Sequence, residues 1–181
     1  MNKTPTIFDT DPGIDDAFAL SFLHKSDVFD VKMLSSVAGN VKLAYTTRNL
    51  QGLAYAMDWQ VPIYKGLDKA ILGKQILAEE FHGVNGLLGY TFNDEELADL
   101  KNQSAIKAMA KVLEENKKTL IIAVGPLTNI ASLILSRPDL KEKISEITIM
   151  GGAVGMGNVT SNAEFNIYAD PEAASIVFKS G

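Results

Sequence analysis

Four aspartates lie within eight residues near the start of the chain, in the segment Asp9-Thr10-Asp11-Pro12-Gly13-Ile14-Asp15-Asp16. Carboxylates at this spacing repel one another, so a hard cation is the natural counter-charge, and oxygen ligands suit Ca²⁺ or Mg²⁺. A simpler interpretation is an acidic turn in which Asp15 or Asp16 caps a helix. That interpretation accounts for one carboxylate and leaves three without a role. We therefore favour a metal site.

The elements around this cluster place it where open α/β sheets bind their ligands. Residues 6–8 are predicted to form a strand and 15–26 a helix, so the aspartates occupy a strand-turn-helix junction. Ligands of such sheets bind at the carboxyl ends of the strands, beside helix N-termini. Asp9 and Asp11 are expected at such an end.

Composition restricts both the kind of protein and the kind of metal site. The 181 residues, 46% of them hydrophobic, are predicted to form a single α/β domain over 1–181. The net charge of -5 argues against nucleic acid or an anionic membrane as a partner. The chain has no cysteine and only two histidines, so a metal must use oxygen ligands. Because no signal-peptide pattern or membrane-length apolar run is present, a cytoplasmic protein is predicted.

Strands and helices are predicted to alternate along most of the chain. The strands are 6–8, 31–38, 61–64, 120–124 and 147–150, and the helices are 15–26, 41–57, 104–116, one from about Leu127, and 171–179. Residues 65–103 are expected to form loops and short helices. The strand 120–124 is apolar on both faces, as in a central strand covered from two sides. This order predicts a doubly wound, mainly parallel sheet with helices on both faces.

Four further segments place small or polar residues just after predicted strands, at 38–41, 82–87, 125–129 and 157–166. Together with DTDPGIDDA they resemble the inosine/uridine-preferring nucleoside hydrolases, a family of calcium-dependent enzymes. The DxDPGxDD and GPLTN signatures are highly specific, whereas HGxxG and the single asparagines are weak. The resemblance implies hydrolysis of the N-glycosidic bond of ribonucleosides to ribose and free base.

The resemblance also implies roles for individual residues. Asp11 matches the general base, which is also a metal ligand, Asp16 the carboxylate that holds Ca²⁺ with both oxygens, and Thr128 a backbone carbonyl ligand. Asp15 and Asn40 match residues that hold the ribose 2'- and 3'-hydroxyls, and Asp9 lies behind the ligands. The remaining matches are Asn158, Glu164 and Asn166 around the ribose 5' side, with Met150 and Phe165 lining the pocket. His82, in a glycine-rich loop, lies either near the base or in solvent.

The physics of N-glycoside cleavage accounts for such a set without reference to a family. The transition state carries positive charge on the sugar, which surrounding carboxylates stabilise. Ca²⁺ orients the diol and water and lowers the pKa of the water, while an aspartate takes the proton. Amides that bind ribose hydroxyls disfavour deoxy analogues, because their own polar groups would be left unpaired.

Members of this family are longer than the present chain, and the resemblance covers their N-terminal part. Their C-terminal part supplies a further calcium-binding aspartate and, in many, a histidine that assists the leaving base, and neither has a counterpart here. A non-catalytic unit that binds calcium or ribosides therefore remains one alternative. We expect the chain to form a homo-oligomer or to associate with the missing portion. The preferred base is not predicted.

A second alternative comes from Asp9-Thr10-Asp11, which imitates the strand-end DxD of haloacid dehalogenase phosphatases. That family continues with Gly-Thr, whereas Pro12-Gly13-Ile14 follows here, and no GDxxxD occurs. Release of phosphate in the presence of Mg²⁺ would support this alternative.

Overall fold

The computed structural model describes residues 3–181, and within this range six parallel strands form one sheet. The strand order is β4-β3-β2-β1-β5-β6, and every neighbouring pair is parallel. The strands are β1 (Thr4–Thr10), β2 (Phe29–Ser36), β3 (Ile63–Lys65), β4 (Leu100–Ser104), β5 (Thr119–Ala123) and β6 (Ile144–Ile149).

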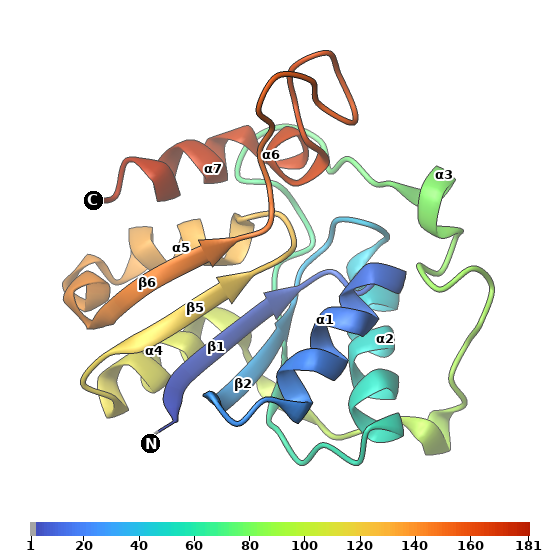
Figure 1. The fold of residues 1–181 in the computed structure, drawn as a ribbon, viewed down its shortest axis with the longest axis horizontal. Coiled ribbons are helices and arrows are strands. Elements are labelled where there is room, and N and C mark those ends of the chain that lie inside the picture. The colour runs from blue at the N-terminus through green and yellow to red at the C-terminus, as the bar shows by residue number, and fades with distance from the viewer. Residues whose placement is uncertain (1–2) are drawn as a thin grey trace.

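Helices lie on both faces of the sheet. Helices α1 and α2 cover one face and α4 and α5 the other, with α7 packed beside α5 (Figure 1). The α-helices are α1 (Ile14–Lys25), α2 (Leu43–Ala56), α3 (Glu79–His82), α4 (Ala105–Glu115), α5 (Thr128–Ser136), α6 (Phe165–Ala169) and α7 (Pro171–Phe178). Two 3-10 helices, η1 (Asp94–Glu96) and η2 (Pro138–Lys143), complete the regular structure of the described residues.

Alternation along the strands builds the two halves of the core. Successive strand residues point to opposite faces, so Ile7 joins the core beneath α4, α5 and α7, whereas Phe8 joins the core beneath α1 and α2. Met33 and Leu34 of β2 divide in the same way. The predicted doubly wound fold is thus confirmed. Because β1 and β2 are packed on both faces, they form a firm support for the loops that follow their carboxyl ends.

Two short elements differ from the sequence-based expectation. The strand β4 begins within the segment 65–103, expected to contain only loops and short helices, and ends at the first residue of the helix expected at 104–116. All five of its residues are exposed, so no hydrophobic alternation marked it. The helix α6 has only five residues and follows a long polar loop. Elements this short leave almost no periodicity to detect.

The strand predicted at 120–124 is not as central as its composition suggested. It forms β5, next to the edge strand β6, and Leu120 and Ile122 are only half-buried. Its other face is fully covered, with Ile121 and Ala123 completely buried. Coverage from two sides is therefore complete for β1 from Thr6 onward and partial for β5.

All six strands run in the same direction, so their carboxyl ends meet at one edge of the sheet (Figure 1). The loops at this edge are held together by backbone hydrogen bonds: Val37 N donates to Thr10 O, and Val124 N donates to Asp9 O. None of the helices that the structure describes is long and apolar enough to cross a membrane.

Candidate active site

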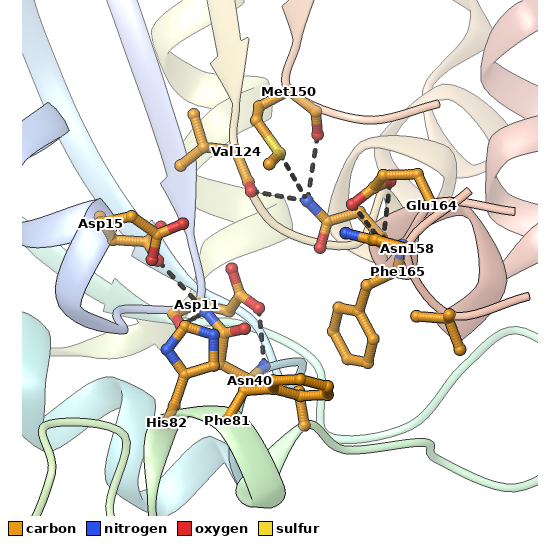
Figure 2. Close-up of a pocket in the computed structure, with 14 residues that line it drawn as sticks. Asp11, Asp15, Asn40, Phe81, His82, Val124, Met150, Asn158, Glu164 and Phe165 are labelled. Atoms are coloured by element: carbon orange, nitrogen blue, oxygen red, sulfur yellow. Dashed lines mark hydrogen bonds between the residues drawn. The ribbon is translucent and has the colours of Figure 1, made fainter. Parts of the chain in front are cut away.

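A cavity of about 230 Å³ opens at the carboxyl edge of the sheet. Figure 2 shows acidic side chains and Asn40 on one side and lining residues of the 150–166 region on the other. The lining residues are Asp11, Asp15, Asp16, Asn40, Ala78, Phe81, His82, Val124, Met150, Asn158, Val159, Glu164, Phe165 and Asn166. We call the side formed by Asp11, Asp15, Asp16 and Asn40 the acidic wall, and the side formed by Met150, Asn158, Glu164, Phe165 and Asn166 the amide wall.

Asn40 joins the two buried carboxylates of the acidic wall. Its backbone N–H donates to Asp11 Oδ2 at 2.7 Å, and its side-chain amide donates to Asp11 O at 3.0 Å and to Asp16 Oδ2 at 3.2 Å. Asp16 also accepts from Thr10 Oγ1 at 2.5 Å and from Gly13 N at 3.0 Å. One asparagine thus fixes the carboxyl end of β1 relative to the start of α1.

Burial makes both carboxylates costly to ionise. Burial, followed by the nearby charge of Asp16, raises the pKa of Asp11 well above its usual range. The pKa of Asp16 is also raised by burial, although hydrogen bonds from Thr10 and Gly13 oppose the shift. None of the ion pairs among residues 3–181 includes either carboxylate. A cation bound here would relieve both the burial cost and the mutual repulsion.

Two glycines leave room for the carboxylate of Asp11. A Cβ on Gly39 would lie 2.1 Å from Asp11 Oδ2, and one on Gly125 would lie 2.7 Å from Asp11 Oδ1. No other residue type fits at either position without moving the carboxylate. The loops after β2 and β5 therefore require glycine at positions 39 and 125, because both loops lie against the Asp11 carboxylate.

Helix capping organises the amide wall. Glu164 caps α6 by accepting from Asn166 N, and it also accepts from Gly152 N at 3.1 Å. Asn166 donates its side-chain amide to Val124 O at 2.8 Å and to Met150 O at 3.0 Å, and Asn158 Oδ1 accepts from Phe165 N at 2.8 Å. Among the described residues the Asn158 amide nitrogen and the Asn166 side-chain oxygen have no partner, so both are available to a ligand.

The structure brings His82, from α3, to the same cavity. Its Nδ1 is buried without a hydrogen-bond partner in the part of the chain that the structure describes. A Cβ on Gly13 would lie 2.6 Å from that nitrogen, so the ring packs against the turn that begins α1. The structure thus places His82 at the cavity and not in open solvent, and its contact with the base stays a prediction.

Two expected residues lie behind the cavity. Thr128 is buried and does not line it, and its hydroxyl donates to Asp170 Oδ2 at 2.6 Å. Asp9 is fully buried, accepts from Ser35 and Asn129, and leaves its Oδ2 without a partner among the residues described. Burial raises the pKa of Asp9 from 3.8 to about 7.

Several residues of the site were missed from the sequence. Phe81, Val124 and Ala78 line the cavity, and Asp170 and Asn129 support it from below. Asn129 belongs to the GPLTN signature and Phe81 directly precedes HGVNG, so both were within reach of a motif-based search. Asp170 carried no such signal, because an acidic residue before a proline is also a common helix cap.

Comparison with known proteins identifies the family. The family model described as inosine-uridine preferring nucleoside hydrolase matches residues 6–181. The chain belongs to this family. It is 44% identical over 179 residues to the pyrimidine-specific ribonucleoside hydrolase RihA of Escherichia coli, and 38% identical to the non-specific ribonucleoside hydrolase RihC of the same species.

Solved structures of this nucleoside hydrolase family share the fold. A plant nucleoside hydrolase, the PpNRh1 enzyme, superposes with a TM-score of 0.89 at 37% identity, covering 99% of this chain and 58% of that one. A purine-preferring ribonucleoside hydrolase from Gardnerella vaginalis gives a TM-score of 0.88 at 29% identity, covering 97% and 58%. The match to RihA covers 98% of this chain and 57% of RihA, so the chain spans little more than half the length of these relatives.

Proposed function

We propose that the site binds a ribonucleoside and hydrolyses its N-glycosidic bond with the help of Ca²⁺, giving ribose and free base. The observation that carries this proposal is the pairing, in one cavity, of two buried carboxylates with a set of amides. Carboxylates stabilise a sugar that becomes positively charged, and amides hold its hydroxyls. Membership of the nucleoside hydrolase family supports the same reaction.

The donor set fits a calcium ion in part. Within residues 3–181 no three acidic or histidine side chains converge to hold a metal by themselves. Asp11 and Asp16 nevertheless form a buried pair, and burial raises the pKa of both, so their ionised forms require a counter-charge. We propose Asp11, Asp16 and the carbonyl of Thr128 as protein ligands, fewer than the six to eight oxygens that Ca²⁺ takes. Bound Ca²⁺ would supply the counter-charge and hold water and the sugar diol.

In the proposed reaction each wall has its own task. Water attacks the anomeric carbon of the ribose as the bond to the base breaks, and the base leaves with the electron pair and takes up a proton. Asp11 accepts a proton from the attacking water, while Asp15 and Asn40 hold the 2'- and 3'-hydroxyls. On the amide wall, Asn158, Glu164 and Asn166 hold the 5' side, and Phe165 and Met150 exclude water from the sugar.

The preferred base stays open. The names of the relatives cover pyrimidine-specific, non-specific and purine-preferring hydrolases, so similarity does not select one. His82 and Phe81 of α3 lie beside Asn40 (Figure 2) and are our candidates for contact with the base. A ribonucleoside is preferred over its 2'-deoxy analogue, because Asp15 and Asn40 would lose a partner.

Release of reducing sugar tests the proposal. The purified 181-residue chain, with its composition checked by intact mass, is incubated with inosine or uridine in the presence of Ca²⁺ or of EDTA. We expect ribose release with Ca²⁺ only, and a loss on the order of 10³-fold or more in Asp11→Ala, which lacks both the base and a ligand. Asp27→Ala is the matched control, since the Asp27 side chain is fully exposed and, within residues 3–181, its carboxylate pairs only with Lys3.

The other outcomes discriminate between the alternatives. Binding of Ca²⁺ or of a ribonucleoside without ribose release would indicate a non-catalytic binding unit. Phosphate release from phosphate esters with Mg²⁺, and none of ribose with Ca²⁺, would instead favour the phosphatase. A loss of only a few fold in Asp11→Ala contradicts the role given to Asp11.

A further inference from the structure

Asp170, between α6 and α7, accepts more hydrogen bonds than a helix cap requires. Its Oδ1 accepts from Ala173 N at 3.0 Å, which is the ordinary cap of α7. Its Oδ2 accepts from Thr128 Oγ1 at 2.6 Å and from Ile71 N at 3.0 Å. The residue is 1% exposed, so these bonds are shielded from water. One oxygen is therefore sufficient for the cap, and the other connects α7 to two distant segments.

Each of the three segments joined by Asp170 leads to a different part of the cavity. Thr128 begins α5 directly after the loop that contains Gly125, against which the Asp11 carboxylate packs. Ile71 lies in the loop that continues to Ala78, whose N–H donates to Asn40 O, and then to α3 with Phe81 and His82. Asp170 itself directly follows α6, which carries Asn166.

We infer that Asp170 is a positioning residue that sets the distance between the acidic wall and the amide wall and holds the loop that carries α3 against both. This inference rests on the proposed function for its effect on substrate, but the coupling of the three segments does not depend on it. Asp170 is buried and does not line the cavity, so it acts through Thr128, Ile71 and α6. A buried carboxylate that accepts three hydrogen bonds holds its partners more firmly than neutral groups would.

Asp170→Asn and Thr128→Val test the coupling. Asparagine keeps the shape of the side chain, but its single oxygen can cap α7 or accept from Ile71, not both. Valine at 128 removes the hydroxyl and keeps the volume, so it provides a second test if the first variant folds poorly. Ser104→Ala is the control: the Ser104 side chain caps α4 through Lys107 N at the exposed end of β4, and it makes no other hydrogen bond among the described residues.

Amide hydrogen exchange is the first measurement, because it requires no activity. In both variants we expect exchange to rise about tenfold in 71–82 and 165–169, which lie on both sides of the cavity. Ser104→Ala should leave both segments unchanged. An increase confined to α7 in Asp170→Asn would show that Asp170 is only a cap, and it would overturn the inference.

The second measurement is the division of the loss between KM and kcat for ribose release. Displaced walls weaken the hold on the ribose, so KM should rise about tenfold in Asp170→Asn, with a smaller loss in kcat. A merely structural role would lower the folded fraction, which reduces apparent kcat and leaves KM unchanged. That result would contradict the inference. If the wild-type chain releases no ribose while exchange rises as expected, the proposed function fails and the coupling stands.

Discussion

At the residue scale, the site depends on carboxylates kept in places where ionisation is costly. Asp11 and Asp16 face each other across Asn40, and Asp9 lies below them with one oxygen unpaired among the described residues. Burial is the first cause of the raised pKa in all three. Such perturbed groups gather at functional sites because catalysis needs charges that bulk water would otherwise screen.

Asp9 makes stability depend on pH. Its folded-state pKa of about 7 lies above its ordinary 3.8, so its contribution to stability is complete below about pH 4 and is lost as the pH rises through 7. Asp9→Asn stays neutral, so its free energy of unfolding should rise relative to the wild type between pH 4 and pH 8. Urea unfolding in EDTA measures this difference. A difference that stays constant across the range would contradict the pKa shift.

At the element scale, the sequence predicted the helices and strands that show hydrophobic periodicity or contain a motif. The helices α2, α4, α5 and α7 and the inner strands were foreseen, since each buries apolar residues at regular spacing, whereas α1 was foreseen from the apolar run after Asp16 although Phe18 and Phe22 are exposed. The exposed edge strand β4 and the five-residue α6 were not, because neither has such a pattern. Most cavity-lining residues came from the resemblance, whereas the role of Asp170 depends on contacts between segments far apart in sequence.

The loops that follow β2 and β5 approach Asp11 so closely that a single methyl group should disturb it. In Gly125→Ala the Cβ would lie 2.7 Å from Asp11 Oδ1 and 2.9 Å from Val37 Cγ1. We expect ribose release to fall by about tenfold or more, with a smaller effect on stability. Gly151→Ala is the control, because it also follows a strand but its nearest contact is 3.3 Å away. Equal activity in the two variants would show that Asp11 tolerates the displacement.

At the scale of the whole molecule, a strongly apolar surface remains in contact with solvent. Phe18 and Phe22 of α1 are 73% and 75% exposed, and Phe18 lines a shallow groove together with Leu88 and Tyr90. Exposed apolar surface of this kind marks interfaces more often than free surface. We therefore expect the chain to associate with a second copy or with another polypeptide.

Sedimentation tests that expectation. The wild-type chain at micromolar concentration should sediment above its 19.6 kDa monomer mass or with a second polypeptide, and Phe18→Ser with Phe22→Ser should shift it toward the monomer. A wild-type chain that sediments as a stable, compact monomer would show that this surface needs no partner.

The central claim is that the acidic wall and the amide wall hold one ribose around one calcium ion, and a crystal structure with millimolar Ca²⁺ and ribose tests it most directly. We predict an ion between Asp11 and Asp16, with the 2'- and 3'-hydroxyls on Asp15 and Asn40. We also predict that the 5' side faces the amide wall. Asp11 and Asp16 pointing apart with no ion between them, or ribose bound elsewhere on the molecule, would contradict the claim.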